Sequence, residues 1–442
     1  MNKPQRILIV TATWKPAQNP NVYRWATIAE QWRSMGHEVH VLCTRRKGQA
    51  LHSEVDGVSV HRAGFNSLLD WLYDLTGKEK RRGEAGGMGD TSAGHLWRRM
   101  LEKIVDYTWR CFYWPDGRCL WYWPGRRRLK TLHQQHGFDR IYSVGIPFTA
   151  HLIALSGKKK EAALLWHMDI EDPFSVSNEG FINNRFLYAG LNRRAEAKAL
   201  RMADSVSVTV EAARKKYALQ FPESADKFSV IPPLFNLKWP DITPAKKHTE
   251  AVIQLAYFGA FYHHIRTPDA FLDLLDKLLA KYPTLPIAVH FYGEIGHPFA
   301  ATFAQYTALK PYLHFHGLVS LEAVAQAMQE VDILVNISNK TTYHLPSKCV
   351  DYLMCRKPII NICYQEADAF KAFFQDYPLI LHLVFPEDKA SEEQIEAIAA
   401  FIKSSKGQLV DEILVRQQIE PHLPQAIASA YLSNSTFTID KP

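Results

Sequence analysis

Apolar residues near the start of the chain follow a strand, helix, strand order. Residues 6–10 form an almost continuous apolar run, which is typical of a strand buried on both faces. Between Val22 and Met35 the apolar residues recur every three or four positions, which predicts a helix, and Gly36 stands where a helix commonly ends. A further apolar run begins at Val39. This spacing predicts a βαβ unit.

The same alternation continues to about residue 210 and starts again after a proline-rich segment. In the first half we expect strands at 141–144, 163–166 and 206–210, and helices at 148–155 and 186–203. In the second half we expect strands at 254–258, 287–292, 313–315, 333–335 and 358–362, and helices at about 268–281, 298–309, 320–329 and 347–354. The pattern predicts an α/β protein with two doubly wound, Rossmann-like domains.

The domain boundaries follow from breaks in this pattern. Prolines cluster from Pro232 to Pro244, which is typical of a linker. The stretch from Val410 to Leu432 is amphipathic and predicts a helix that returns to the first domain. The expected division is a first domain at 1–232 with an insertion at about 65–130, a linker at 233–250, a second domain at 251–409, and the C-terminal helix within 410–442.

The composition is typical of globular domains, and the basic residues are concentrated in one part of the chain. The chain has 442 residues, of which 47% are hydrophobic and 22% charged, and its net charge is +7. Basic residues gather at 78–82 and at Arg126, Arg127 and Arg128, which predicts a surface patch with a partner on one side.

An aromatic stretch at 109–123, with Trp114 and Trp121, precedes the three arginines. These rings either meet an anionic membrane surface together with the arginines or pack the insertion onto the first domain, and the sequence leaves both interpretations open. We expect no nucleic-acid partner, because no RNA-binding signature accompanies the rings.

Apolar runs in the sequence are short. The run at 6–10 is too short for a signal peptide, and no run reaches about 18 apolar residues. We therefore expect a cytoplasmic protein, with a peripheral place on the inner face of the plasma membrane as an open alternative.

The strongest candidates for ligand-binding residues lie in the segment 341–360, TTYHLPSKCVDYLMCRKPII. It follows an expected strand and leads into an expected helix, with Ser347 at the N-cap position and Lys348 beside it. Free N–H groups at such a helix start, together with the lysine, favour an anion. Asp351 lies one turn further and suits the two hydroxyls of a ribose. Alternatively, Ser347 is a simple cap and Asp351 a surface carboxylate.

This segment resembles a known family signature. Leu-Pro-Ser-Lys-Cys-Val-Asp-Tyr-Leu at 345–353 and Lys-Pro-Ile-Ile at 357–360 are similar to the Pro-Ser-Lys-x-x-Glu-Tyr and Lys-Pro-Val-Ile pattern of family 4 retaining glycosyltransferases with the GT-B fold, particularly those that build bacterial surface polysaccharides. Gly-His-Glu-Val at 36–39 and Asp-Ile-Glu-Asp-Pro at 169–173 also resemble family segments. The likeness runs from about residue 6 to 365. Two departures stand out, since Tyr343 replaces the first glutamate of the family's acidic pair and Glu171 stands where arginine is frequent.

The resemblance implies a GT-B enzyme whose two domains face a central cleft. It would move a sugar with retention from a nucleotide diphosphate, UDP or GDP, to a glycan acceptor, expected to be lipid-linked, in surface polysaccharide synthesis. No Asp-x-Asp is present to hold a bridging Mg²⁺, so we expect no metal, and no cofactor. A sugar-nucleotide epimerase on the same fold and a non-catalytic scaffold subunit remain alternatives.

The candidate residues fall into three groups. Positive charge and N–H groups suit a departing diphosphate, and glycines at strand ends suit the base pocket, which gives the donor set Gly259, Arg266, Gly293, Glu294, Gly317, His344, Ser347, Lys348 and Asp351. The catalytic candidates follow an expected strand of the first domain: His167, Asp169 and Asp172, although a lone histidine is also commonly structural. The acceptor or membrane side comprises Arg24, Trp114, Trp121, Arg126, Arg127 and Arg128.

Overall fold

The computed structural model describes most of the chain in two compact units. The described residues are 3–17, 19–46, 48–65, 108–109, 111–176, 182–235, 252–263, 265–346 and 348–433, with 297 and 298 described by their backbone alone. The first unit comprises Met1–Thr209, Arg214–Ile231 and Ala428–Pro442, and the second Val210–Ala213 and Pro232–Ile427. Residues 66–107 of the predicted insertion and 236–251 of the predicted linker lie outside the described ranges.

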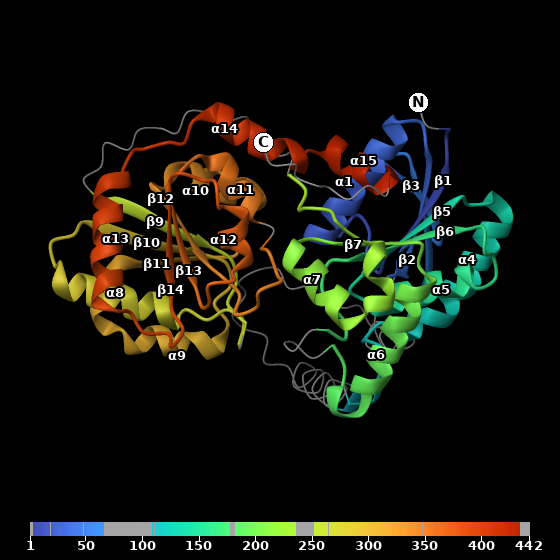
Figure 1. The fold of residues 1–442 in the computed structure, drawn as a ribbon, viewed down its shortest axis with the longest axis horizontal. Helices are drawn as coiled ribbons and strands as arrows, with labels where there is room; N and C mark the ends of the chain where they lie inside the picture. Colours follow the sequence, from blue (N-terminus) through green and yellow to red (C-terminus); the bar gives the residue numbers. More distant parts are fainter. Residues whose placement is uncertain are drawn as a thin grey trace. The chain divides into compact units, whose positions relative to one another are not determined.

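An eight-stranded sheet organises the first unit (Figure 1), in the order β3-β4-β2-β1-β5-β6-β7-β8. Its neighbouring strands are parallel except in the antiparallel β3–β4 pair. The strands are β1 (Arg6–Val10), β2 (Glu38–Arg45), β3 (His52–Val55), β4 (Val58–Phe65), β5 (Arg140–Gly145), β6 (Leu165–Ile170), β7 (Ser205–Val208) and β8 (Phe228–Val230). The described helices along this part are α1 (Pro20–Ser34), η1 (Cys119–Trp121), α4 (Tyr122–His136), α5 (Phe148–Lys158), α6 (Arg185–Met202), α7 (Glu211–Gln220) and η2 (Pro222–Lys227).

Local sequence explains why the first βαβ unit forms. The four apolar residues Ile7 to Val10 of β1 are fully buried, as expected for a central strand covered on both faces. Helix α1 starts at Pro20 after Asn19, whose side chain accepts from the Val22 N–H. It ends where Gly36 adopts φ +91°, a left-handed conformation that suits glycine.

A six-stranded parallel sheet organises the second unit, in the order β11-β10-β9-β12-β13-β14. The strands are β9 (Ile253–Phe258), β10 (Ile287–Tyr292), β11 (Leu313–Gly317), β12 (Ile333–Ile337), β13 (Ile359–Cys363) and β14 (Ile380–Val384). The described helices that follow along the chain are α8 (Asp269–Lys281), α9 (His297–Gln305), η3 (Thr307–Tyr312), α10 (Leu321–Glu330), α11 (Lys348–Cys355), α12 (Ala369–Phe373), α13 (Glu392–Ser405), α14 (Glu412–Ile419), η4 (Glu420–His422) and α15 (Pro424–Ser433), whose residues from Ala428 on belong to the first unit.

Both faces of the second sheet are buried at its central strands, whereas the edge strand β11 is largely exposed. Figure 1 shows α8 and α9 on one face and α10 and α11 on the other. Successive residues of β9 alternate between the two cores, since Leu255 and Tyr257 pack with α8 while Ala256 and Phe258 pack with α10 and α11. A strand covered on both sides is therefore apolar at most positions, and in β9 the exception is Gln254 near its start.

The structure confirms the α/β class, and most predicted elements lie within two residues of their expected positions. Several segments differ by more. The helix expected at about 298–309 is α9, which ends at Gln305 and is followed by the 3-10 helix η3. Strand β6 runs on to Ile170, beyond the predicted end at 166, so that His167 and Asp169 lie inside the strand. Helix α4 begins within the segment predicted as an insertion and packs against α5 and β4. The single helix predicted from Val410 to Leu432 is wrong, because the chain forms α14, η4 and α15, which Pro421 and Pro424 separate.

Candidate functional site

Three glycines close the adjacent strands β9, β10 and β11 at their carboxyl ends. Gly259, Gly293 and Gly317 have φ values of +151°, +135° and +65°. The N–H of Gly259 donates to Tyr292 O at 2.8 Å, and that of Gly293 donates to Gly317 O at 2.8 Å. A Cβ on Gly293 would lie 2.4 Å from the Gly259 carbonyl oxygen. The turns therefore pack backbone against backbone, and position 293 requires glycine.

The sheet order makes the surroundings of these turns a candidate ligand site. Strand β9 pairs with β10 on one side and with β12 on the other, so the direction of winding changes between β9 and β12. Ligands of open α/β sheets bind outside the carboxyl ends of the strands at such a point. The loop after β12 leads to helix α11, which carries two of the predicted donor residues.

Lys348, the first residue of α11, reaches back to the end of β9. Its Nζ donates to the Phe258 carbonyl at 3.0 Å and lies 4.3 Å from the centre of the Tyr257 ring. Burial, followed by repulsion from Arg266, holds the pKa of Lys348 well below its ordinary value. The ammonium therefore lacks an anionic partner among the described residues, which suits a site that receives a negative ligand.

Arg266 joins the loop after β9 to the loop after β12. Its Nε and Nη2 donate to Asn339 Oδ1 at 3.0 and 2.8 Å. The backbones also meet, since the Lys340 N–H donates to Ile265 O at 2.7 Å. Asn339 thus fixes the position of Arg266 through a neutral amide. This partner does not neutralise the positive charge of the guanidinium.

Asp351 lies in the first turn of α11 and is half-buried. Its carboxylate has no hydrogen-bond or ion-pair partner among the described residues, and burial raises its pKa to about 7. A shielded carboxylate of this kind is costly unless a ligand supplies hydrogen-bond donors. This unpaired carboxylate is the clearest sign of a binding site in the second unit.

The other predicted donor residues are placed as follows. His344 is half-buried, with Nδ1 2.9 Å from Thr341 Oγ1, and its ring contacts Tyr343. Tyr343 is itself buried, so an aromatic ring fills the position of the family's first glutamate. Glu294 is exposed after β10. Ser347 lies outside the described residues, so its role as an N-cap stays a prediction.

A second polar cluster lies in the first unit, where β6 ends. The Tyr431 hydroxyl of α15 donates to Asp169 Oδ1 at 2.8 Å, and Arg24 Nη2 of α1 donates to the Tyr431 oxygen at 3.0 Å. Asp169 is 2% exposed, and burial raises its pKa although Arg24 opposes the shift. Arg24 is also buried; its burial alone would lower its pKa, but Tyr431, Asp169 and Glu171 raise it.

Glu171 belongs to this cluster and was not predicted as a site residue. Asn21 donates to its Oε2, and its Oε1 lies 3.8 Å from Arg24 Nε without a hydrogen bond. Burial and the adjacent Asp169 raise the pKa of Glu171 to about 8. The signal in the sequence was its departure from the family's Asp-x-Arg-Asp-Pro segment.

Glu171 makes the stability of the protein dependent on pH. A carboxyl that keeps its proton in the folded state favours folding fully below its unfolded pKa, about 4.5, and this contribution is lost as the pH rises through about 8. We expect chemical denaturation of the wild type to show falling stability across this interval. Glu171→Gln, an uncharged isostere, should show a smaller fall, and an identical pH profile for both proteins would contradict the assignment.

His167 and Asp172 occupy very different places. Both ring nitrogens of His167 are 2.8 Å from hydroxyls, Nδ1 from Ser205 and Nε2 from Ser207, and burial lowers its pKa to about 3. This arrangement leaves no ring nitrogen for a substrate and favours a positioning role. Asp172 is exposed just beyond the strand.

The predicted acceptor or membrane residues divide between the interior and the surface. Trp121 is fully buried, so its ring packs internally, which was one of the two alternatives. Trp114 is half-buried and donates to Asn192 Oδ1 at 2.9 Å. Arg128 Nη2 lies 3.4 Å from His61 Nδ1. Trp123, which is 60% exposed, forms a cation–π contact with Arg126 at 5.4 Å.

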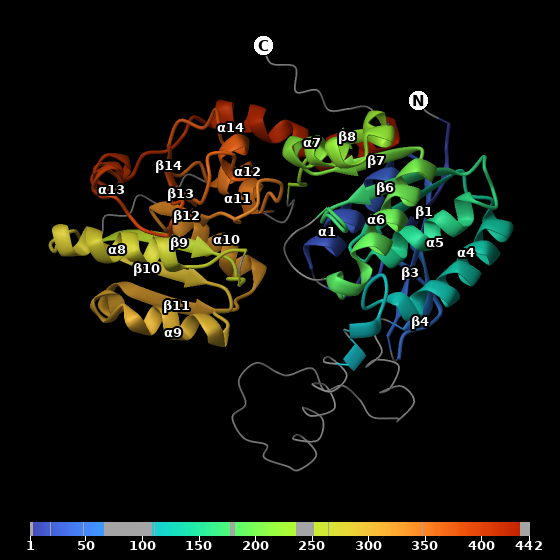
Figure 2. The ribbon, with the colours of Figure 1, turned by 60° about the horizontal axis from the view of Figure 1, so that its bottom comes forward.

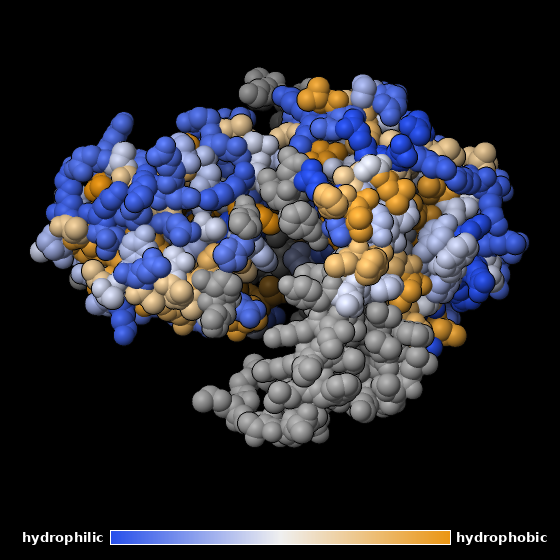
Figure 3. Space-filling model, turned by 90° about the horizontal axis from the view of Figure 1, so that it is seen from below, coloured by the Kyte–Doolittle hydropathy of each residue, from blue (hydrophilic) through white to orange (hydrophobic). Residues whose placement is uncertain are grey.

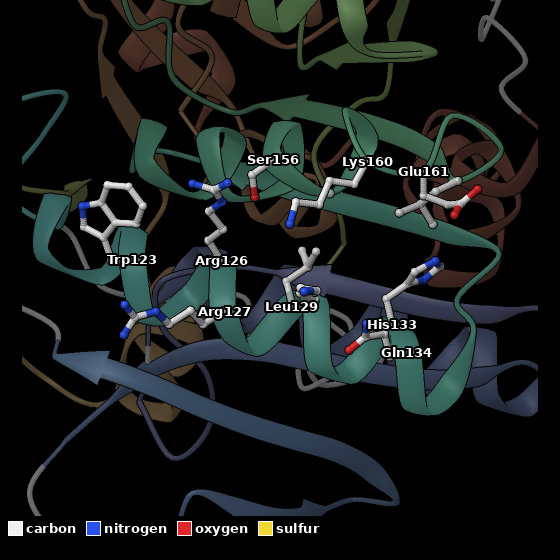
Figure 4. Close-up of a pocket in the computed structure, with 12 residues that line it drawn as sticks. Trp123, Arg126, Arg127, Leu129, His133, Gln134, Ser156, Lys160 and Glu161 are labelled. Carbon is white, nitrogen blue, oxygen red and sulfur yellow. The ribbon is translucent and has the colours of Figure 1, made fainter.

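Arg126 and Arg127 line a basic pocket of about 440 Å³ between α4 and the end of α5. Figure 4 shows side chains of α4 facing Ser156 and Lys160 across it. Its lining includes four cationic side chains and one carboxylate: Arg126, Arg127, Lys130, Lys160 and Glu161.

Apolar patches are interspersed with polar ones on the described surface (Figure 3). No helix among the described residues combines the length and apolar character needed to cross a membrane.

Comparisons with known proteins agree with this architecture. Residues 22–233 match the family described as the glycosyl transferase 4-like domain. No curated protein matches the sequence. Solved structures match over nearly the full chain at low sequence identity, which shows the fold alone.

Three of these structures illustrate the likeness. A glycosyltransferase from Rickettsia africae ESF-5 is 11% identical, with a TM-score of 0.59 and 98% of each chain covered. The lipopolysaccharide outer core galactosyltransferase WaaB is 12% identical, with a TM-score of 0.55 and 97% of this chain and 98% of that chain covered. HepE from Anabaena, in complex with UDP-glucose, is 15% identical, with a TM-score of 0.52 and 97% of this chain and 100% of that chain covered. The chain therefore has the GT-B fold, and its residues 22–233 match the family described as the glycosyl transferase 4-like domain.

Proposed function

We propose that this protein is a glycosyltransferase that takes a sugar from a nucleotide diphosphate bound at the carboxyl edge of the second sheet. It transfers the sugar with retention to a glycan acceptor, which is lipid-linked, in surface polysaccharide synthesis. The observation that carries the donor site is the unpaired Asp351 carboxylate, beside Lys348 and the turns after β9 and β10. The structural likeness to HepE, whose structure contains UDP-glucose, supports a donor of this class.

Each donor residue has a role that follows from its chemistry. Asp351 accepts hydrogen bonds from the ribose hydroxyls, while Lys348 and Arg266 neutralise the diphosphate. The N–H groups of the glycine turns add partial positive charge, and the turns at Gly293, Glu294 and Gly317 contact the base. His344, beside α11, lies at the sugar and phosphate end of this site.

Positive charge is what the reaction requires most. Transfer with retention and without a covalent intermediate develops charge on the departing diphosphate and on an oxocarbenium-like sugar. Fixed cations at the diphosphate stabilise that transition state without reorganisation. Lys348 and Arg266 supply the charge that a bridging metal ion would otherwise supply, so we propose that donor binding is independent of metal.

The lowered pKa of Lys348 should make nucleotide binding detectable as an uptake of protons. A diphosphate beside the amine raises its lowered pKa, so binding takes up protons wherever the free amine is partly neutral. Calorimetry of UDP binding in buffers of different ionisation enthalpy should show net proton uptake in the pH range in which the free amine is partly neutral. Lys348→Met should bind about tenfold or more weakly, in line with the loss of a charge-assisted hydrogen bond, and without that uptake. Unchanged uptake in the variant would exclude Lys348 from the diphosphate.

The first unit provides the acceptor side in this proposal. Glu171 and Asp172, at the end of β6, contact the acceptor, and Arg24, Asp169 and His167 position them. The basic pocket of α4 and α5 suits the phosphates of an anionic membrane surface, with Trp123 exposed at its rim. A lipid-linked acceptor would be presented at such a surface.

A calorimetric screen tests the donor class. UDP, GDP, ADP, CMP and their sugars are titrated into the wild-type protein with and without EDTA. We expect one diphosphate to bind with micromolar affinity and to be insensitive to EDTA. If none binds, or if binding requires a divalent ion, the proposed donor site is wrong.

A further inference from the structure

Three histidines meet in the first unit, away from the carboxyl ends of its strands. His40 comes from β2, His61 from the neighbouring β4, and His136 is the last residue of α4. One ring nitrogen of each lies within 4.8 Å of the others. Among the described residues, no other set of three potential metal ligands converges in this way.

The contacts within the cluster resemble those around a bound metal ion. His40 Nδ1 lies 3.0 Å from His61 Nε2, while two nitrogens on a tetrahedral Zn²⁺ at about 2.0–2.1 Å would be roughly 3.3 Å apart. The other nitrogen of His40, Nε2, lies 2.6 Å from Glu38 Oε1. A ligating histidine commonly donates its second N–H to a carboxylate, which fixes the ring and its tautomer.

Two of the three histidines are deeply buried. His40 and His61 are 3% and 4% exposed, and His136 is half-buried at the end of its helix.

We propose that His40, His61 and His136 bind one divalent transition metal ion, for which Zn²⁺ is the fitting probe, with Glu38 orienting His40. The fourth position is open to water. The ion would link β2, β4 and the end of α4, so its role is structural. This site is separate from the donor site. The proposal of a metal ion here does not depend on whether the donor nucleotide binds without metal.

The alternative is a chain of hydrogen bonds without metal. Arg128 Nη2 lies 3.4 Å from His61 Nδ1, and a chain from Arg128 through His61 and His40 to Glu38 would satisfy each ring. Metal binding at His61 Nε2 moves the ring proton to Nδ1, so the Arg128 side chain must turn away. The two arrangements therefore differ in a measurable way.

The same chain contains a matched control. His290 Nδ1 and His316 Nε2 in the second unit are 2.9 Å apart, the same kind of contact as between His40 and His61. Within the described residues this pair is not part of a three-ligand group. The variant His316→Asn therefore tests whether a histidine pair without a third ligand accounts for any metal binding.

The experiment uses the full chain stripped with EDTA and dialysed. Calorimetry with Zn²⁺ and visible absorption with Co²⁺ should show one ion per chain with tetrahedral bands for the wild type and for His316→Asn. His61→Asn and His136→Asn should bind at least tenfold more weakly and lose the bands. Zn²⁺ should raise Tm in the wild type and in His316→Asn but not in the other two variants. Because His136 is half-buried at a helix end, its variant keeps the test valid if His61→Asn fails to fold. Absence of Co²⁺ bands in the wild type, or equal loss in His316→Asn, would overturn the proposal.

Discussion

Replacing Asp351 with alanine is expected to weaken binding of the donor nucleotide about 100-fold. A hydrogen bond to a charged group contributes about 1.5–3 kcal/mol, and about 2.7 kcal/mol, within the range for one such bond, corresponds to a factor of 100. Calorimetric titration of the wild type and the variant with the preferred diphosphate measures this ratio. The fold should be preserved, because the wild-type carboxylate has no partner among the described residues.

Two controls separate a ribose contact from a general effect of charge. Glu393→Ala removes an exposed carboxylate from the first turn of α13 and should leave the affinity unchanged. Asp351→Asn keeps the shape and should remove the rise in wild-type affinity as the pH increases through about 7, where the carboxyl ionises. If the alanine variant binds the nucleotide as the wild type does, Asp351 is a surface acid with a raised pKa, and the donor site lies elsewhere.

Replacing Gly293 with alanine is expected to have the largest effect on the folded second unit. The new Cβ would lie 2.4 Å from the Gly259 carbonyl oxygen, and φ +135° is a conformation that side chains rarely adopt. Strain of this kind costs about 1–3 kcal/mol, and the overlap with fixed backbone adds a similar amount, so we expect a loss of about 3 kcal/mol or more. Chemical denaturation followed by circular dichroism measures it.

Gly407 provides the matched control for this substitution. It has φ +73°, and nothing lies within 4 Å of a Cβ built on it, so Gly407→Ala carries the conformational cost without the overlap. We expect it to lose about 1 kcal/mol. Equal losses for the two variants would show that the turns after β9 and β10 tolerate a side chain between them.

The sequence predicted most of the strands that alternate with helices and missed β3, β4, β8 and β14. Strand β4 was not predicted, because His61 and Arg62 look polar although they are buried and bonded to neighbouring groups. The end of β6 was placed too early for the same reason, since His167 and Asp169 are paired with serines of β7. Their partners lie about 40 residues away, beyond the reach of a local pattern.

The two sites differ in how far the sequence could reveal them. Lys348 and Asp351 lie within one short segment after a strand, so their common place followed from spacing alone. The cluster of Arg24, Asp169 and Tyr431 joins residues up to 407 positions apart, and only the fold brings them together. Burial of Trp121 was likewise undecidable, because an aromatic ring next to arginines has the same composition at a membrane and in a core.

The most direct measurement follows a labelled sugar from the nucleotide that the protein binds. The wild-type protein is incubated in EDTA with the labelled sugar nucleotide and a lipid-linked glycan fraction, and the products are separated and examined by NMR. The account predicts that label enters the lipid fraction in a glycosidic bond with the anomeric configuration of the donor, and that Asp351→Ala abolishes this at the same donor concentration. Release of an epimerised sugar or sugar nucleotide without transfer, or donor binding without turnover on any acceptor, would contradict it.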